Sequence, residues 1–279
     1  MTPDALELDT KQRSSKHHLR TRSESVRLPA TEVRELFNDR APTWGRKYAP
    51  RGKLVWRLRE FSLPLGTLVS PPDAVLDFGC GAGHLAGHLC EHGFDVTACD
   101  IAEKMIAAAR GEFASTNIDW VTLSPEWIRL PFADQSFEAV VASSVLEYVE
   151  DVDLVFRELS RVLRDGGVLL FNVPNPHNAR RRRERLIRAL ARIGWIRRAA
   201  CALPRGRRYL RYLSLSRTRL PLREWRDRAH QFGLQEIEIS GTRAASAALS
   251  LIGLRKETGL VRPQSRSAMR AELGNPYIR

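Results

Sequence analysis

The feature that most constrains the fold of this 279-residue chain is an apolar run that ends in a glycine-rich turn. It reads Val75-Leu76-Asp77-Phe78-Gly79-Cys80-Gly81-Ala82-Gly83, and the helical pattern of Ala82–Glu91 follows it. A short buried strand, a sharp turn and a helix in that order predict the first unit of a parallel α/β sheet. The turn also presents bare backbone N–H groups at a helix N-terminus, where a ligand can contact them.

Beyond this unit, predicted strands and helices alternate along the chain. We expect further strands at Asp95–Cys99, Ile118–Leu123, Glu138–Ala142, Val168–Val173 and Leu234–Ile239, and helices at Ala102–Phe113, Asp151–Leu163 and Pro221–Phe232. This alternation predicts the α/β class, with a doubly wound, mostly parallel sheet. No seventh strand can be read after Ile239, and we interpret Ala244–Leu254 as a helix.

The glycine turn alone is compatible with more than one interpretation. Gly81, Gly83 and Ala86 satisfy the G-x-G-x-x-G/A pattern of a dinucleotide site. Asp100 follows at the distance expected of a ribose-binding acid. A tight strand-to-helix turn without any ligand would need the same glycines. The choice between these kinds of site therefore depends on the sequence motifs that follow the turn.

Four phrases occur in order along the chain: Asp77-x-Gly79-x-Gly81-x-Gly83; Asp100 after the second predicted strand; Leu130-Pro131-Phe132-x-x-x-Ser136-Phe137-Glu138; and Val145-Leu146-Glu147-Tyr148-Val149 with Arg161-Val162-Leu163-Arg164-Asp165-Gly166-Gly167. Together they resemble the class I methyltransferases that use S-adenosylmethionine (SAM). The resemblance is closest to the type 11 branch, which includes ubiquinone/menaquinone and biotin-pathway methyltransferases. It covers roughly Phe37 to Ser240 and implies a Rossmann-like fold with SAM as methyl donor.

The resemblance also implies cofactor contacts. Asp100 matches the acid that holds the ribose hydroxyls, and Phe37–Tyr48 resembles an entry segment that closes over cofactor and substrate as a lid. Glu126 stands where the family usually has Asp, in a turn that lies beside the adenine in the family. For Trp127, the next residue, two interpretations are open: stacking on the adenine, or ordinary packing. The expected cofactor-binding residues are Asp77, Gly79, Gly81, Gly83, Asp100, Ile101, Glu126, Trp127, Ser143 and Tyr48.

Methyl transfer from a sulfonium is an in-line displacement, so orientation can supply much of the rate. A general base is needed only when the acceptor starts protonated. Glu147, Tyr148 and His177 are the candidates, because they lie near predicted carboxyl ends of strands, but the sequence assigns a catalytic role to none of them. No C-x-x-C pair is present, and we expect no metal.

The positive charge of the chain is confined to one segment. The formal net charge is +13, yet residues 178–219 contain fifteen Arg and a single acid, Glu184, which leaves 30 basic and 31 acidic residues elsewhere. Wound as a helix, this segment aligns Leu186, Leu190 and Ile193 beside arginines, a pattern typical of interfacial membrane binding. The interpretations of this segment, in order, are an insertion that packs over the substrate with its arginines solvated, a membrane surface and a nucleic-acid surface.

These patterns divide the chain into six parts. We expect a disordered basic tail (1–28), an N-terminal helical lid (29–70), a SAM-binding Rossmann-like core (71–177), the Arg-rich amphipathic insertion after the fifth strand (178–219), the last helix and strand of the core (220–243) and a C-terminal extension (244–279).

The expected function is methyl transfer to a small-molecule or lipid-linked substrate, with O- or C-methylation favoured by the resemblance. An RNA-binding SAM-dependent methyltransferase is the alternative. The N-terminus has no apolar run and no stretch approaches the length of a membrane span. We therefore expect a cytoplasmic protein, with peripheral contact to the inner membrane surface as an option.

Overall fold

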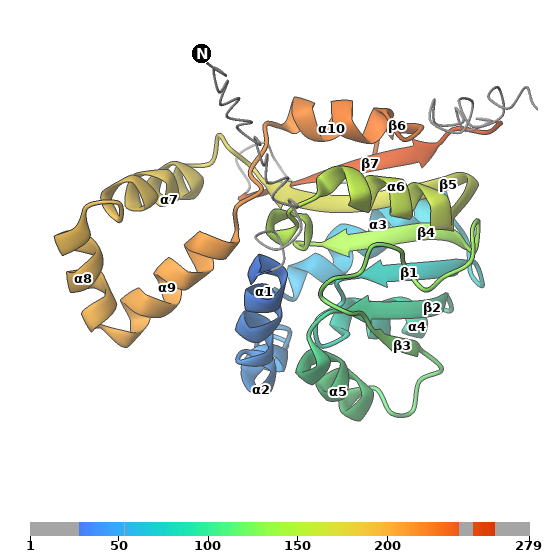
Figure 1. Ribbon diagram of the computed structural model, residues 1–279. Coiled ribbons are helices and arrows are strands. Elements are labelled where there is room, and N and C mark those ends of the chain that lie inside the picture. The colour runs from blue at the N-terminus through green and yellow to red at the C-terminus, as the bar shows by residue number, and fades with distance from the viewer. Residues whose placement is uncertain (1–27, 53, 240–247, 260–279) are drawn as a thin grey trace, which may run out of the picture.

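The computed structural model describes residues 28–52, 54–239 and 248–259. Within them a seven-stranded sheet has the order β3-β2-β1-β4-β5-β7-β6 (Figure 1). The strands are β1 (Ala74–Phe78), β2 (Asp95–Asp100), β3 (Asp119–Thr122), β4 (Phe137–Ser143), β5 (Leu163–Pro174), β6 (Leu234–Ile237) and β7 (Leu249–Lys256). The expected α/β architecture, doubly wound and mostly parallel, is confirmed.

The five strands from β3 to β5 are parallel, and the direction of chain progression reverses between β1 and β4. In open parallel sheets this reversal opens a crevice at the carboxyl ends of the two strands, where ligands bind. The glycine-rich turn that follows Phe78 therefore lies at the expected ligand-binding edge of the sheet.

Helices cover both faces of the sheet because successive residues of each buried strand point to opposite sides. On one face, Phe61 of α3 (Trp56–Leu68) and Leu85 of α4 (His84–Glu91) pack against Val75. On the other face, Phe156 of α6 (Val152–Val162) and Trp225 of α10 (Leu222–His230) pack against the strands. Trp225 is fully buried and contacts the rings of Phe156 and Phe171 edge-on.

The expectation for the chain after β6 was wrong. Where a helix was expected over Ala244–Leu254, the structure has β7, which is antiparallel to both β5 and β6. Residues 244–247 lie outside the described part of the chain. Ile252 packs into the core on one face of the sheet and Leu251 on the other. A strand covered on both faces reads as a continuous apolar run, which periodicity cannot distinguish from a buried helix.

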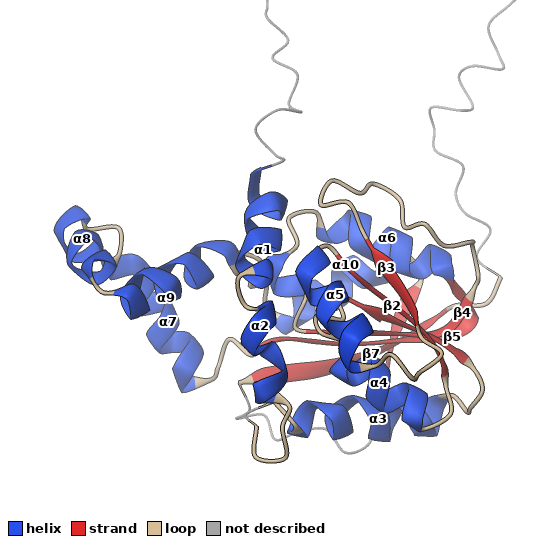
Figure 2. Cartoon of the chain, turned by 90° about the horizontal axis from the view of Figure 1, so that it is seen from below, coloured by secondary structure: helices blue, strands red, loops and turns tan. Residues whose placement is uncertain are grey.

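Two groups of helices stand at the carboxyl edge of the sheet. α1 (Leu28–Asn38), α2 (Ala41–Trp44) and the 3₁₀ turn η1 (Gly45–Lys47) lie beside α5 (Glu103–Glu112), and the short turn η2 (Leu146–Tyr148) follows β4. α7 (Ala179–Leu190), α8 (Gly194–Ala202) and α9 (Pro204–Leu215) form what we call the arm, residues 179–215. Figures 1 and 2 show the arm extending away from the sheet.

The described residues contain no helix with the length and apolar character needed to cross a membrane. The predicted basic tail, apart from its last residue, lies outside the described residues, as does most of the predicted C-terminal extension. The Arg-rich insertion is divided into three helices instead of forming one amphipathic helix.

Candidate functional site

The glycine turn is tied to the end of β2 by hydrogen bonds. The backbone N–H groups of Gly79 and Cys80 donate to the carbonyl oxygen of Cys99 at 2.8 and 3.0 Å. The Asp100 carboxylate accepts from the N–H of Gly81 at 2.8 Å and from that of Ala102 at 2.8 Å. The turn and the acid after β2 are therefore held as one unit before any ligand binds.

Gly81 and Gly83 serve different purposes in this turn, although both have a positive φ, of 56° and 77°. A Cβ on Gly83 would collide with the ring of Trp120, so this glycine allows α4 to pack closely on the strands. A Cβ on Gly81 would meet only Trp44, at 3.4 Å, and Gly81 lines a large cavity. Gly83 does not line that cavity.

The cavity has a volume of about 1120 Å³ and lies at the carboxyl ends of β1, β2 and β4. This exceeds the roughly 300–1,000 Å³ of common ligand pockets, so there is room for a cofactor together with a second molecule. Apart from Gly83, every residue expected to bind the cofactor lines it: Asp77, Gly79, Gly81, Asp100, Ile101, Glu126, Trp127, Ser143 and Tyr48.

Two buried oxygens at this cavity have no hydrogen-bond partner among the described residues: Oδ2 of Asp77 and Oγ of Ser143. Burial raises the pKa of Asp77 to about 7, and the neighbouring charge of Asp100 adds to the shift, against a hydrogen bond from the backbone of Ala86. Buried polar atoms are rarely left without partners. The two oxygens are therefore ready to accept hydrogen bonds from a donor or cation in the cavity.

Aromatic side chains form the walls of the cavity. The Tyr48 ring stacks on His84 with centroids 4.5 Å apart, and Trp127 meets Phe78 edge-on at 5.9 Å. Lys47 places its Nζ 3.3 Å from the centroid of the Trp44 ring. The turn that carries Glu126 and Trp127 and the expected lid segment thus line the same cavity.

The three candidate bases lie in different surroundings. His177 is exposed and is not among the residues that line the cavity. Glu147 is buried, and one carboxylate oxygen accepts a short hydrogen bond from the Ser216 hydroxyl. Tyr148 lines the cavity, and its pKa is raised well above 10.0 by burial and by the nearby charge of Glu147. Tyr148 therefore remains a neutral hydroxyl that can donate a hydrogen bond.

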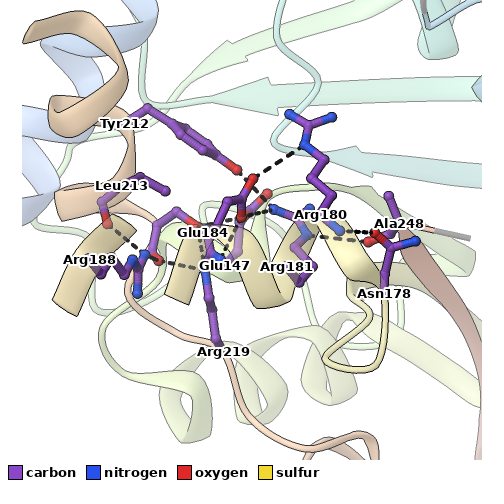
Figure 3. Close-up of polar contacts among 11 residues, drawn as sticks. Glu147, Asn178, Arg180, Arg181, Glu184, Arg188, Tyr212, Leu213, Arg219 and Ala248 are labelled. Atoms are coloured by element: carbon purple, nitrogen blue, oxygen red, sulfur yellow. Dashed lines mark hydrogen bonds and ion pairs between the residues drawn. The ribbon is translucent and has the colours of Figure 1, made fainter. Parts of the chain in front are cut away.

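A buried network of charges attaches the arm to the site (Figure 3). Glu184 is fully buried and accepts hydrogen bonds from Arg181 at 2.9 Å and from Arg219 at 2.7 Å. Arg219 also donates to the Ser216 hydroxyl, which in turn donates to Glu147. The single acid of the Arg-rich segment thus connects the base of the arm to the turn after β4.

The arm also lines the cavity, which is the position expected for an insertion that packs over the substrate. Five arginines of the segment border the cavity, of which Arg180, Arg205 and Arg208 are also exposed to solvent: Arg180, Arg181, Arg205, Arg208 and Arg211. Arg40, which precedes α2, lines it as well. Helical spacing could have grouped Arg205, Arg208, Tyr209 and Tyr212 on one face of a helix, but it could not show which space that face borders.

A seven-stranded sheet in this order, with a glycine turn after β1 joined to an acid that closes β2, defines the class I SAM-dependent methyltransferase fold. Residues 76–171 match the family model described as a methyltransferase domain, type 11. This part of the chain, about a third of its length, is therefore a methyltransferase domain.

Curated relatives match part of the chain. Over 95 residues it is 38% identical to a ubiquinone/menaquinone biosynthesis C-methyltransferase of Desulfotalea psychrophila, covering 33% of this chain and 38% of the relative. Over 116 residues it is 37% identical to a malonyl-[acyl-carrier protein] O-methyltransferase of Erwinia pyrifoliae, covering 42% and 41%. The chain thus spans about four tenths of the length of these relatives.

A solved structure is similar in fold over a longer range. Magnesium protoporphyrin IX methyltransferase from Synechocystis superposes with a TM-score of 0.54 at 15% identity, covering 82% of this chain and 97% of that one. Identity at this level shows the fold alone.

Proposed function

We propose that this protein transfers a methyl group from SAM to a small-molecule or lipid-linked acceptor, at an oxygen or carbon atom. The observation that carries the proposal is the meeting of the glycine turn, Asp100 and the two unpartnered oxygens of Asp77 and Ser143 in one cavity. The names of the relatives, a C-methyltransferase and an O-methyltransferase, favour these acceptor atoms.

The residues present fit the cofactor. SAM supplies an activated methyl group on a sulfonium, together with an ammonium group, a ribose diol and an adenine ring. The Asp100 carboxylate, which accepts from Gly81 and Ala102, can also accept from a ribose hydroxyl through a remaining lone pair. Asp77, once ionised, would accept from the ammonium group, and Trp127 presents a ring to the adenine. The bare backbone of Gly81 allows the cofactor to approach closely.

The acceptor would be oriented by the remaining walls. The neutral Tyr148 hydroxyl can donate to an acceptor oxygen and fix its position. The rings of Phe37, Trp44 and Tyr48 cover the cavity and exclude water from the transfer.

Incubation of the purified protein with methyl-labelled SAM and a fractionated bacterial extract tests the function. Label should enter a lipid or small-molecule fraction, and calorimetry should show that SAM binds. Absence of SAM binding would overturn the proposal. Label found in RNA would instead support the alternative, an RNA methyltransferase.

We further propose that the arm contacts an anionic membrane surface. Five of its large apolar side chains are exposed: Leu186 (59%), Leu190 (40%), Ile193 (44%), Trp195 (68%) and Leu203 (66%). Exposed arginines adjoin them, among them Arg182, Arg183 and Arg185. Apolar side chains that insert between lipids, flanked by cations that meet anionic headgroups, are the properties of an interfacial helix. A lipid-linked acceptor would then reach the cavity from the surface on which the arm rests.

A further inference from the structure

The part of the cavity bordered by the arm is built by two elements far apart in the sequence. Arg40 comes from the turn before α2, and α9 contributes Arg205, Arg208, Tyr209 and Tyr212. The four α9 residues follow i, i+3, i+4, i+7 spacing, which places them on one face of that helix. Arg211 joins α9 to α1 through ion pairs with Glu35 at 3.3 Å and Asp39 at 3.0 Å.

Several arginines around this space are already neutralised. Arg180 and Arg181 pair with Glu184 at 3.3 and 2.9 Å, and Arg211 is paired with the two acids of the first helix and the turn after it. These ion pairs within the protein are sufficient to explain why Arg180, Arg181 and Arg211 lie where they do. They leave the other cations at the cavity without such an explanation.

Arg40, Arg205 and Arg208 make no side-chain hydrogen bond or ion pair with any residue in the described ranges. The guanidinium of Arg40 lies 5.6 Å from the ring centroid of Phe37 and 5.9 Å from that of Tyr212. Rings from two elements therefore hold this cation in place while its N–H groups have no anionic partner. Arg205 and Arg208 are exposed and stand at the mouth of the same cavity.

The local electrostatics favour the binding of an anion in this part of the cavity. Burial, followed by the positive charges of Arg40 and Arg57, lowers the pKa of Lys47 to about 8. Like charges that gather around one cavity are stabilised when an anion enters between them. The apolar walls of this space, which include Val33, Val149 and Leu249, suit a hydrocarbon portion of the same molecule.

We infer that the methyl acceptor is an amphiphilic anion, whose carboxylate or phosphate is bound by Arg40, Arg205 and Arg208. This inference rests on the proposed function, because it assigns the acceptor of the same site. Arginine matches both anions, since its planar fork can donate two parallel hydrogen bonds to either. Whether the group is a carboxylate or a phosphate is decided by the probes of the experiment.

The experiment uses the full chain saturated with S-adenosylhomocysteine, so that the carboxylate of the cofactor is already in place. Octanoate, octyl phosphate and octanol are titrated separately by calorimetry. At least one of the two anions should bind about tenfold more tightly than octanol, as expected for one or two charge-assisted hydrogen bonds. The tighter anion identifies the acceptor group.

Two double variants of the arm separate site binding from general charge. Arg205→Gln with Arg208→Gln should weaken binding of the anion about tenfold, and binding of S-adenosylhomocysteine should not change. Arg197→Gln with Arg198→Gln removes the same charge from exposed positions of α8 outside the cavity and should leave anion binding unchanged.

Three outcomes would overturn the inference while the proposed function stands. They are octanol binding as tightly as both anions, no binding of any probe to protein that holds S-adenosylhomocysteine, and equal losses in the two double variants. If S-adenosylhomocysteine itself does not bind, the proposed function fails first, and the acceptor assignment fails with it.

Discussion

The Asp100 carboxylate accepts a hydrogen bond of 2.8 Å from the backbone N–H of Gly81, and this contact joins the end of β2 to the turn after β1. Two residues that are 19 positions apart in the sequence thus define one edge of the cofactor site. The same carboxylate is the expected ribose acceptor, so it has a structural and a binding role together.

We therefore expect Asp100→Ala to affect two measurements. Loss of a charged acceptor for ribose hydroxyls should weaken SAM binding by roughly 1.5–3 kcal/mol, and loss of the bonds to Gly81 and Ala102 should lower the melting temperature. Calorimetry and thermal denaturation report the two effects separately. Unchanged SAM affinity in a folded variant would refute the ribose assignment.

The glycine turn offers a matched pair of variants. Gly81→Ala places its methyl group at the cavity and near Trp44, so the fold should persist at a cost of about 1–2 kcal/mol for the left-handed backbone, while SAM binding is lost. Gly83→Ala drives a methyl group into Trp120 and should unfold the protein more readily. Normal SAM binding by the Gly81 variant would show that this turn serves only the fold.

The pH dependence of cofactor binding should follow Asp77. Because its pKa is about 7, the carboxyl is largely protonated below that pH and cannot pair with a cation. SAM affinity should rise with pH up to about 7, by at most about tenfold per pH unit. Calorimetry from about pH 5.5 to about pH 8 measures this profile, and Asp77→Asn should flatten it.

The same shift has a consequence for stability, with a defined sign. A folded pKa raised from 3.8 to about 7 means that the folded protein holds this proton more tightly than the unfolded chain does. The contribution of Asp77 to stability is therefore complete below pH 3.8 and is lost as pH rises through 7. Without cofactor, Asp77→Asn should be more stable than the parent protein at about pH 8 in chemical denaturation.

Removal of the acid that anchors the arm should be costly. Glu184→Gln leaves the buried Arg181 and the partly buried Arg219 without their carboxylate, and loss of a buried partner of this kind costs about 3–5 kcal/mol. Trypsin should then cut the arm faster than in the parent protein. Arg180→Gln removes a partner that is 66% exposed and should change stability by less than about 1 kcal/mol. Equal trypsin resistance in both variants would contradict the anchoring role.

The anchor should also weaken in acid. Burial by itself would raise the pKa of Glu184, but the hydrogen bonds and charges of Arg181 and Arg219 hold it below 4.5. Its stabilising contribution is therefore complete above pH 4.5 and is lost as pH falls through the lowered pKa. Trypsin is inactive at such acidic pH, so proteolysis cannot measure the change. Hydrogen exchange of the α7 amides as a function of pH is the suitable measurement.

Adhesion to membranes should depend on the exposed arginines of α7. Replacement of Arg182, Arg183 and Arg185 by Gln should weaken binding to anionic liposomes by roughly 3 kcal/mol, at about 1 kcal/mol for each cation near the surface. The same change at Arg46, Arg59 and Arg223, exposed residues outside the arm, is the control. Parent protein that does not sediment with anionic liposomes at low salt would rule out the membrane contact.

The order of the strands up to β6, the helices α4, α5, α6 and α10 and the location of the glycine turn could be predicted from the sequence, because they rest on local signals. Asp77 through Gly83 specify a strand, a turn and a helix start by residue type alone, and the alternation that follows specifies a parallel sheet. The last strand, β7, was not readable, because burial on both faces removed the alternation that identifies a strand.

The surroundings of the site were decided only by the tertiary structure. Charge count marks residues 178–219 as basic, but nothing in the local pattern separates Arg181, which is buried on Glu184, from Arg182, which is exposed. Likewise Arg40 and Arg208 meet at one cavity although 168 positions separate them. Sequence determines which side chains can carry a charge or line a turn. Which of these charges are paired and which remain free depends on long-range packing.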